Sequence, residues 1–247
     1  MTLTGIDRRA ELAGNLERVR DRLARACAAA GRSPAEVTLV AVTKTYPAAD
    51  VRHLAALGLT DVGENRDQEA APKAAEVGGL PGPAVRWHFI GQLQRNKAKS
   101  VVRYADVVQS VAGVRLAGAL GRAAERLRER PLDVLVQVSL DGDPARGGAV
   151  PGGGVAEEDR VLDSVLAAVA AEPALRLRGL MAVAPAEEEP AAAFARLSRV
   201  VAAVRAAYPE ATALSAGMSG DLEAAIEHGA THVRVGSALL GARAPLR

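Results

Sequence analysis

Lys44 is the residue of this chain best suited to covalent chemistry. It follows a run of small and β-branched apolar residues from Val37 to Val42, which predicts a short strand buried on both faces. Its primary amine can form a Schiff base with a carbonyl group, which the guanidinium of arginine cannot do. Lysine is also a rare choice here, because only four of the 31 basic residues are lysines: Lys44, Lys73, Lys97 and Lys99. A strand-end lysine that extends its ammonium into solvent is the alternative interpretation.

Two turns near the C-terminal end combine glycine with serine and could bind an anion. One contains Gly217, Met218 and Ser219, and the other is Gly236-Ser237. Glycine lets backbone N–H groups approach a phosphate closely, and the hydroxyl of Ser219 at the start of the following helix is a further donor. Simple tight turns are the alternative interpretation of each glycine taken singly.

Arg234 lies inside an apolar strand, between Val233 and Val235. A polar group in such a place is costly without a partner. It therefore either forms a salt bridge or donates to a ring nitrogen or an anion of a ligand. An amine that forms Schiff bases, a phosphate turn and an arginine between them together suggest pyridoxal 5′-phosphate.

The composition is that of an ordinary soluble protein. Of the 247 residues, 49% are hydrophobic and 24% are charged. A net charge of +2, with arginines spread among acids, gives no indication of a nucleic-acid partner. The N-terminus lacks the apolar core of a signal peptide, and no apolar run reaches membrane-spanning length. We therefore expect a cytoplasmic protein without membrane contact, in which the single Cys27 is buried by packing.

Short apolar runs alternate with helical patterns along the whole chain. The pattern predicts eight strands, at 37–42, 59–63, 85–90, 106–109, 132–138, 175–181, 211–214 and 231–235. Helices are predicted at 8–30, 48–57, 96–102, 115–130, 157–170, 189–207 and 222–228, and a further helix follows Arg66 and ends at about residue 77. No linker of different composition interrupts this order, so we expect residues 1–247 to form a single domain.

This order favours an α/β fold, a single (β/α)8 barrel of the TIM type with one extra N-terminal helix. A doubly wound open sheet is the alternative, and the fourth and seventh strands have the weakest patterns. In a barrel, the residues that follow the strands meet at one rim. The positions that would meet at that rim are Lys44, Glu64-Asn65, Gly91-Gln92, Ser110, Met181, Ser215 to Ser219 and Gly236-Ser237.

Other chemistries lack their sequence patterns. The glycine-rich stretch from Asp141 to Gly154 does not have the strand–GxxxxGK[ST]–helix order of a P-loop. The four histidines have no metal-ligand spacing, so no metal site is predicted. No Gly-x-Ser-x-Gly elbow occurs either.

Six motifs resemble, in the same order, those of the pyridoxal-phosphate homeostasis proteins (YggS/PROSC-like). They are Val40–Thr45, Gly63–Asn65, Trp87–Lys97, Arg178–Met181, Gly217–Asp221 and Val233–Ser237. The resemblance covers nearly the whole chain, and the block from Trp87 to Lys97 is long and unusual. It departs from the family at Thr43, Arg66-Asp67, Arg146 and Ala216, and in a longer glycine-rich loop, without removing a cofactor-contacting group.

The resemblance implies a barrel similar to the N-terminal domain of alanine racemase that binds pyridoxal phosphate. Lys44 matches the lysine that forms the internal aldimine, and Arg234 matches the arginine that faces the pyridine nitrogen. The phosphate-binding turns are matched by Ser219, Gly236 and Ser237, and Asn65 lies beside the cofactor. The cofactor-binding set is therefore Lys44, Asn65, Met218, Ser219, Arg234, Gly236 and Ser237.

The implied function is intracellular pyridoxal phosphate homeostasis without established catalysis, with apo-enzymes as candidate recipients. An arginine at the ring nitrogen disfavours its protonation and weakens the ring as an electron sink. A racemase also needs a second base, which a further β domain supplies in alanine racemases and which we do not expect here. Two alternatives stay open: a narrow-scope pyridoxal-phosphate enzyme such as an amino-acid racemase, with Tyr46 or Tyr104 as base, and a class I aldolase-like barrel that uses Lys44 without cofactor.

Overall fold

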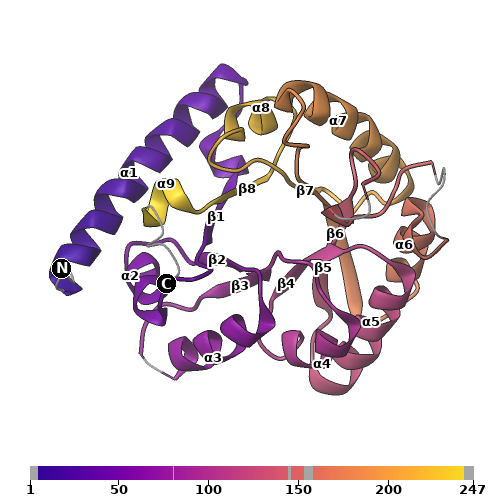
Figure 1. The fold of residues 1–247 in the computed structure, drawn as a ribbon, viewed down its shortest axis with the longest axis horizontal. Coiled ribbons are helices and arrows are strands. Elements are labelled where there is room, and N and C mark those ends of the chain that lie inside the picture. Colours follow the sequence, from indigo (N-terminus) through magenta and orange to yellow (C-terminus); the bar gives the residue numbers. More distant parts are fainter. Residues whose placement is uncertain (1–4, 80, 144–145, 153–157, 242–247) are drawn as a thin grey trace.

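Eight parallel strands close into a barrel in the computed structural model, which describes residues 5–79, 81–143, 146–152 and 158–241. Each strand pairs with the next along the chain, and the last pairs with the first, so the sheet has no edge. The predicted (β/α)8 barrel is thereby confirmed (Figure 1). The strands are β1 (Thr38–Val42), β2 (Asp61–Glu64), β3 (Arg86–Phe89), β4 (Val107–Val111), β5 (Leu132–Val138), β6 (Leu175–Ala182), β7 (Ala213–Ser215) and β8 (His232–Val235).

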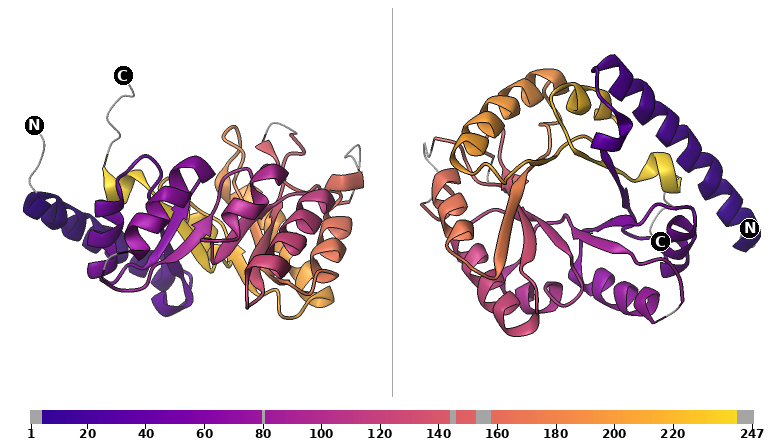
Figure 2. Two further views of the ribbon diagram at one scale, coloured as in Figure 1. Left: turned by 90° about the horizontal axis from the view of Figure 1, so that it is seen from below. Right: turned by 180° about the vertical axis from the view of Figure 1, so that it is seen from behind.

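Helices surround the barrel, and one additional helix precedes β1, as predicted. That helix, α1, packs along α2, α8 and α9 on the outside of the ring (Figures 1 and 2). Among these helices, none is long and apolar enough to cross a membrane over the part of the chain described. They are α1 (Gly5–Ala29), α2 (Ala48–Ala56), α3 (Asp67–Gly78), α4 (Ala98–Val101), α5 (Val114–Leu127), α6 (Leu162–Ala170), α7 (Pro190–Ala207), α8 (Leu222–Glu227) and α9 (Ser237–Leu240), with 3₁₀ turns at Pro34–Glu36, Arg95–Lys97 and Glu158–Arg160.

The boundaries of two weakly patterned strands differ from the prediction, and both differences bear on the site. The seventh strand begins at Ala213 rather than at residue 211, because the N–H of Ala211 closes a turn onto Tyr208 O. It then continues to Ser215, which becomes part of the sheet. The fourth strand extends to Val111 across an irregularity in its pairing with β5, so Gln109 lies within it.

Three local predictions were incomplete. The short helix α9 directly after β8 was not predicted. The helix predicted at 96–102 is a 3₁₀ turn followed by a single α-helical turn. The helix predicted from residue 157 begins at Leu162; residue 157, like Gly153 and Gly154 of the glycine-rich stretch, lies outside the described residues.

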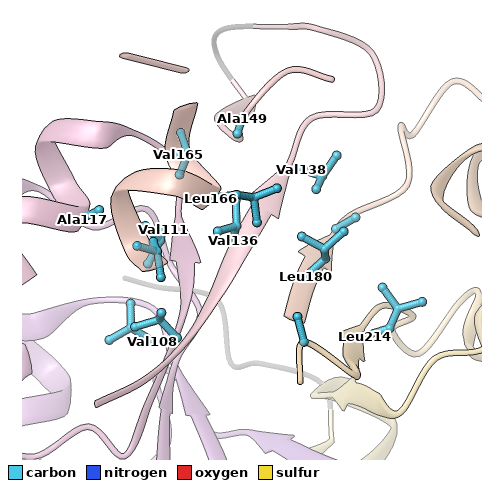
Figure 3. Packing of buried hydrophobic residues seen from close by; sticks show 14 of the residues in the cluster. Val108, Val111, Ala117, Val136, Val138, Ala149, Val165, Leu166, Leu180 and Leu214 are labelled. Atoms are coloured by element: carbon cyan, nitrogen blue, oxygen red, sulfur yellow. The ribbon is translucent and has the colours of Figure 1, made fainter. Parts of the chain in front are cut away.

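The largest hydrophobic layer lies between the strands and the helices that cover them. Val136 and Val138 of β5 and Leu180 of β6 belong to one buried cluster with Val165 and Leu166 of α6 (Figure 3). Complete burial of one such side chain stabilises the fold by about 1.5–3 kcal/mol. Cys27 is fully buried in the corresponding layer beside α1, which confirms its expected packing role, and burial raises the pKa of its thiol.

The interior of the barrel is divided into an apolar half and a polar half. Residues alternate between the two faces of a strand, and Val233 and Val235 of β8 pack toward the helices, so Arg234 faces inward. Hydrogen bonds across the lumen join it to polar residues of β4 and β7. The apolar half is a small cluster of Val107, Leu135 and Met181 with Val183 and Ala213.

Charged side chains form the floor of the barrel at the N-terminal ends of the strands. Asp133 accepts from Arg176 at 2.5 Å and from Arg86 at 3.2 Å, and Arg86 also approaches Asp61 at 4.0 Å. Linked ion pairs of this kind contribute more than isolated surface pairs. The functional residues predicted from the sequence lie at the opposite rim.

Candidate functional site

Strand pairing places the turn after β1 between the turns of its two neighbours. Val42 pairs with Gly63 of β2, and on its other side its Cβ lies 3.5 Å from the position that a Cβ on Gly236 would occupy. Lys44 follows Val42 by two residues and is half-buried. It therefore lies at the rim between the β2 turn that contains Asn65 and the β8 turn that contains Gly236, as predicted.

A buried ion cluster beneath the Lys44 turn holds its backbone. Lys73 of α3 donates to the Thr43 carbonyl at 2.9 Å and to carboxylate oxygens of Glu64 and Glu69, both at 2.7 Å. The Thr43 hydroxyl donates to Glu64 at 2.6 Å, and the N–H of Thr45 donates to Glu69. The three donors of the Lys73 ammonium are thus all used, and they tie together β1, β2 and α3.

Thr45 adopts a backbone conformation that β-branched residues rarely take. Its φ is +70°, in the left-handed region. Such a conformation costs about 1–3 kcal/mol and persists only when the surroundings enforce it. Here the hydrogen bond from its N–H to Glu69 provides that enforcement, one residue after Lys44.

Glu64 is a fully buried carboxylate that lies outside the barrel lumen. Burial raises its pKa, and this effect outweighs the hydrogen bonds from Lys73 and Thr43. Its Oε2 has no hydrogen-bond partner among the described atoms, whereas Oε1 accepts from both neighbours. This cluster was not predicted; the spacing of Glu69 and Lys73, four residues apart on one helix, was the signal that could have indicated part of it.

Asn65 is positioned by a close contact between two rim turns. A Cβ placed on Gly91, directly after β3, would lie only 2.1 Å from the Asn65 carbonyl oxygen. Glycine is therefore required at that position, and the β3 turn supports the β2 turn from the side. Asn65 is half-buried and follows β2 directly.

Arg234 is buried in the lumen without a carboxylate against it in the described part of the protein. Its Nη1 donates to the Ser215 carbonyl and hydroxyl at 2.8 and 2.7 Å, and its Nη2 donates to the Ala182 carbonyl at 2.9 Å. Burial lowers the pKa of Arg234 to about 10, and the negative charge of Asp221 opposes that effect. Of the two interpretations made from the sequence, the salt bridge is not formed with any described residue, and the three bonds leave two of the five guanidinium donors, Nε–H and the second N–H of Nη2.

The two glycine turns lie at the rim on the β7 and β8 side. Gly217 has a φ of +90°, and a Cβ there would lie 2.6 Å from Ala225 of α8, so the turn requires glycine. The N–H of Met218 already donates to Asp221 at 2.6 Å, and its side chain is 40% exposed. Ser237 opens α9, and the first N–H groups of a helix have no acceptor within it.

Helix α1 supports both turns from outside the barrel. Arg22 donates to the Ser219 carbonyl at 2.7 Å, and Asn15 and Arg8 donate to the carbonyls at the end of α9, at 2.8 and 3.0 Å. These contacts join residues that are 197, 224 and 232 positions apart in the sequence, so no local pattern could have indicated them. The additional helix is therefore part of the construction of the site.

A hollow of about 780 Å³ opens on the same rim over the ends of β3, β4 and β5. Its lining includes Gln92, Gln137, Arg160 and Ser110, whose buried hydroxyl is without a partner in the described residues. It shares no lining residue with the predicted cofactor set.

The two tyrosines considered as bases lie away from the lumen or are engaged. The Tyr46 hydroxyl donates to the Gly241 carbonyl at 2.8 Å. Tyr104 packs among helices, and burial raises the pKa of its hydroxyl, which opposes its use as a base. The described residues also contain no group of three His, Cys, Asp or Glu side chains that could hold a metal ion.

The fold is that of the alanine racemase N-terminal domain class. Residues 14–244 match the family model described as "Alanine racemase, N-terminal domain". The alanine racemase of Corynebacterium glutamicum has this fold, with a TM-score of 0.68 at 17% identity over 97% of this chain and 64% of that one.

Within that class, the chain belongs to the pyridoxal phosphate homeostasis proteins. It is 46% identical to the protein of that name from Mycobacterium bovis, over 96% of this chain and 95% of that protein. The Escherichia coli K12 homologue of that name is 39% identical over 94% and 97% of the two chains. The structure of PipY from Synechococcus elongatus with PLP bound matches at a TM-score of 0.76, with 34% identity over 93% of this chain and all of that one.

Replacement of Lys73 tests the role of the buried cluster. We expect Lys73→Met to lower the free energy of unfolding by about 3–5 kcal/mol, because it leaves Glu64 as an uncompensated buried charge. A carboxyl whose pKa is raised in the folded protein binds protons more readily there than in the unfolded chain. The decrease in the free energy of unfolding caused by Lys73→Met should therefore be larger at pH 8 than at pH 5, as measured by urea unfolding.

The double variant Lys73→Met/Glu64→Gln is the control. It removes both charges, so it should be more stable than Lys73→Met and lose most of the dependence on pH. If the single variant is as stable as wild type at pH 8, the cluster does not constrain the turn.

Proposed function

We propose that this protein binds pyridoxal 5′-phosphate through a Schiff base on Lys44 and serves its homeostasis. The observation that carries the proposal is the convergence of Lys44, Arg234 and the two glycine turns at one rim of a closed barrel. The names of the curated relatives and the PLP-bound structure of PipY support the choice of ligand. We further propose that residues 1–247 form one cofactor-binding domain that acts in the cytoplasm.

The donor set at the rim fits this cofactor. An aldehyde requires a primary amine, which Lys44 supplies, and Lys73 is not available because its three donors are engaged. A phosphate requires backbone and hydroxyl donors, which Ser219, Gly236 and Ser237 offer beside the start of α9. A ring nitrogen accepts a hydrogen bond, and Arg234 can only donate. Asn65 and the side chain of Met218 would flank the ring.

Carriage of the cofactor fits this site better than catalysis. When bound, pyridoxal phosphate supplies an electron sink whose strength depends on protonation of its ring nitrogen. Arg234 has no proton-accepting atom, so it favours the unprotonated nitrogen. Glu64 faces away from the lumen and Asp221 accepts from Met218, so neither carboxylate is placed as a base. We propose that apo-enzymes receive the cofactor from this site.

The Schiff-base site can be mapped directly. Borohydride reduction of the loaded protein, followed by peptide mass mapping, should place the pyridoxyl group on Lys44. Lys44→Ala should lose the label and the yellow absorption band. Lys97→Ala, which removes another lysine near the rim, should retain both. A label on Lys73, Lys97 or Lys99 would contradict the assignment.

The phosphate turns make the affinity depend on the 5′-phosphate. Hydrogen bonds to a charged group contribute about 1.5–3 kcal/mol each, so loss of two should weaken binding roughly a hundredfold or more. We expect pyridoxal to bind at least that much more weakly than pyridoxal phosphate in a spectrophotometric titration. Ser237→Ala should reduce the difference in affinity between pyridoxal phosphate and pyridoxal. Equal affinities would rule out these turns as the phosphate site.

Exchange of a substrate α-proton separates a carrier from a racemase-like enzyme. In heavy water, the loaded protein should exchange the α-proton of alanine no faster than free pyridoxal phosphate at the same concentration, because the described residues place no second base beside Lys44 at the rim. Proton NMR measures the exchange. A rate well above that of the free cofactor would establish the enzyme alternative.

A further inference from the structure

A chain of hydrogen bonds crosses the barrel lumen from the candidate site to the floor. Arg234 Nη1 donates to the Ser215 hydroxyl at 2.7 Å, and that hydroxyl donates to Gln109 Oε1 at 2.7 Å. Gln109 Nε2 then meets His88 Nδ1 at 2.8 Å, and His88 Nε2 meets Asp61 Oδ1 at 2.9 Å. The five residues come from β8, β7, β4, β3 and β2, so the chain spans the polar half of the lumen.

The chemistry of the groups fixes the direction of this chain. Arginine donates only, and a carboxylate accepts only. Between them, Ser215 must accept from Arg234 and donate to Gln109, whose amide N–H then points at His88. His88 therefore accepts at Nδ1 and carries its proton on Nε2, where Asp61 accepts it. Every hydrogen bond runs from the cation toward the anion.

The opposite arrangement leaves a buried group without a partner. If the Gln109 amide turned around, its N–H and Arg234 would both donate to the Ser215 oxygen, and the Ser215 O–H would lose its acceptor. His88 would then have to carry a proton on Nδ1. A buried hydroxyl without a partner costs about 1–3 kcal/mol. The charge of Asp61 at the floor thus selects one orientation of Gln109 and of Ser215.

We propose that Asp61, His88, Gln109 and Ser215 are positioning residues that orient Arg234 for the ring nitrogen of the bound cofactor. The inference rests on the proposed function and extends it to residues at the far end of the barrel. No described carboxylate contacts Arg234 directly, and the polarised chain connects it to Asp61. These bonds hold both Nη atoms in place, and Nε–H and the second N–H of Nη2 are the donors left for a ligand.

Other charged groups around the chain do not replace Asp61. The second buried histidine, His232, lies with its ring 6.2 Å from that of His88, but its Nδ1 meets the Thr231 hydroxyl. Burial lowers the pKa of His232 to about 4, so it is neutral. Arg86 approaches Asp61 from the floor at 4.0 Å and is itself paired with Asp133.

Asp133 offers a matched control for Asp61. Both aspartates lie at the floor and face Arg86, but only Asp61 is bonded to His88. Asp61→Asn and Asp133→Asn thus remove the same charge from the same network. Gln109→Met interrupts the chain at its centre and provides a second variant if Asp61→Asn does not fold.

The first measurement uses the ligand-free protein, in which ¹⁵N NMR distinguishes a protonated from an unprotonated ring nitrogen. Wild type and Asp133→Asn should show His88 with its proton on Nε2 alone. Asp61→Asn should show a mixture of the two tautomers. A proton on Nδ1 in wild type would overturn the directed chain.

The second measurement is titration with pyridoxal phosphate followed in the visible spectrum. Loss of one hydrogen bond that orients Arg234 should weaken binding roughly three- to tenfold and shift the absorption maximum in Asp61→Asn and Gln109→Met. Asp133→Asn should keep the wild-type affinity and maximum even where its stability falls. If Asp61→Asn and Asp133→Asn show the same affinity and the same spectrum, the inference is wrong but the proposed function stands. If wild type does not bind pyridoxal phosphate, the proposed function itself is wrong.

Discussion

The buried ammonium of Lys73 is the constraint on which the Lys44 turn depends. Burial of an ion pair is expensive, and its attraction seldom exceeds the cost of removing both charges from water. The consequence of burying Lys73 is geometric, because three acceptors must meet its one nitrogen: one directly after β1, one in β2 and one in α3. Glu69, held by that nitrogen, in turn holds Thr45 in a strained conformation. The position of Lys44 thus follows from a charge that cannot be left unpaired.

The lumen departs from the usual filling of an (β/α)8 barrel, which consists of layers of branched apolar side chains. Only the half around Leu135 and Met181 follows that rule. In the other half, His88, Gln109 and Arg234 replace apolar residues, and each is hydrogen-bonded. Polar groups in such a place specify a single arrangement when all of them are satisfied. A rigid floor and a rigid rim are therefore joined through the interior.

Local sequence patterns predicted the strands and helices of this fold. The features that they did not predict depend on turns and on contacts between distant parts of the chain. The apolar run at β1 and the isolated Arg234 in β8 indicated both the strands and their chemistry, because these signals lie within a few residues. The three residues of β7 were too few for a pattern, and the N–H of Ala211 decides where that strand begins. The support that Arg22 gives to Ser219 joins residues 197 apart, which no local signal encodes. The contacts of the predicted cofactor residues with a ligand stay predictions.

Under the proposed function, the distribution of donors and acceptors at the rim limits what the site could do to a bound aldehyde. Lys44 and Arg234 are cationic groups, and the α9 terminus presents N–H groups, so the rim is matched to an anion with an electrophilic carbon. Two carboxylates near the rim are placed for other contacts: Glu64 lies outside the lumen, where its Oε1 accepts from Lys73, and Asp221 accepts from the backbone N–H of Met218. Proton abstraction needs a free acceptor within hydrogen-bond reach of the ligand. This distribution of donors and acceptors is the reason why the proposed function is carriage of the cofactor rather than catalysis.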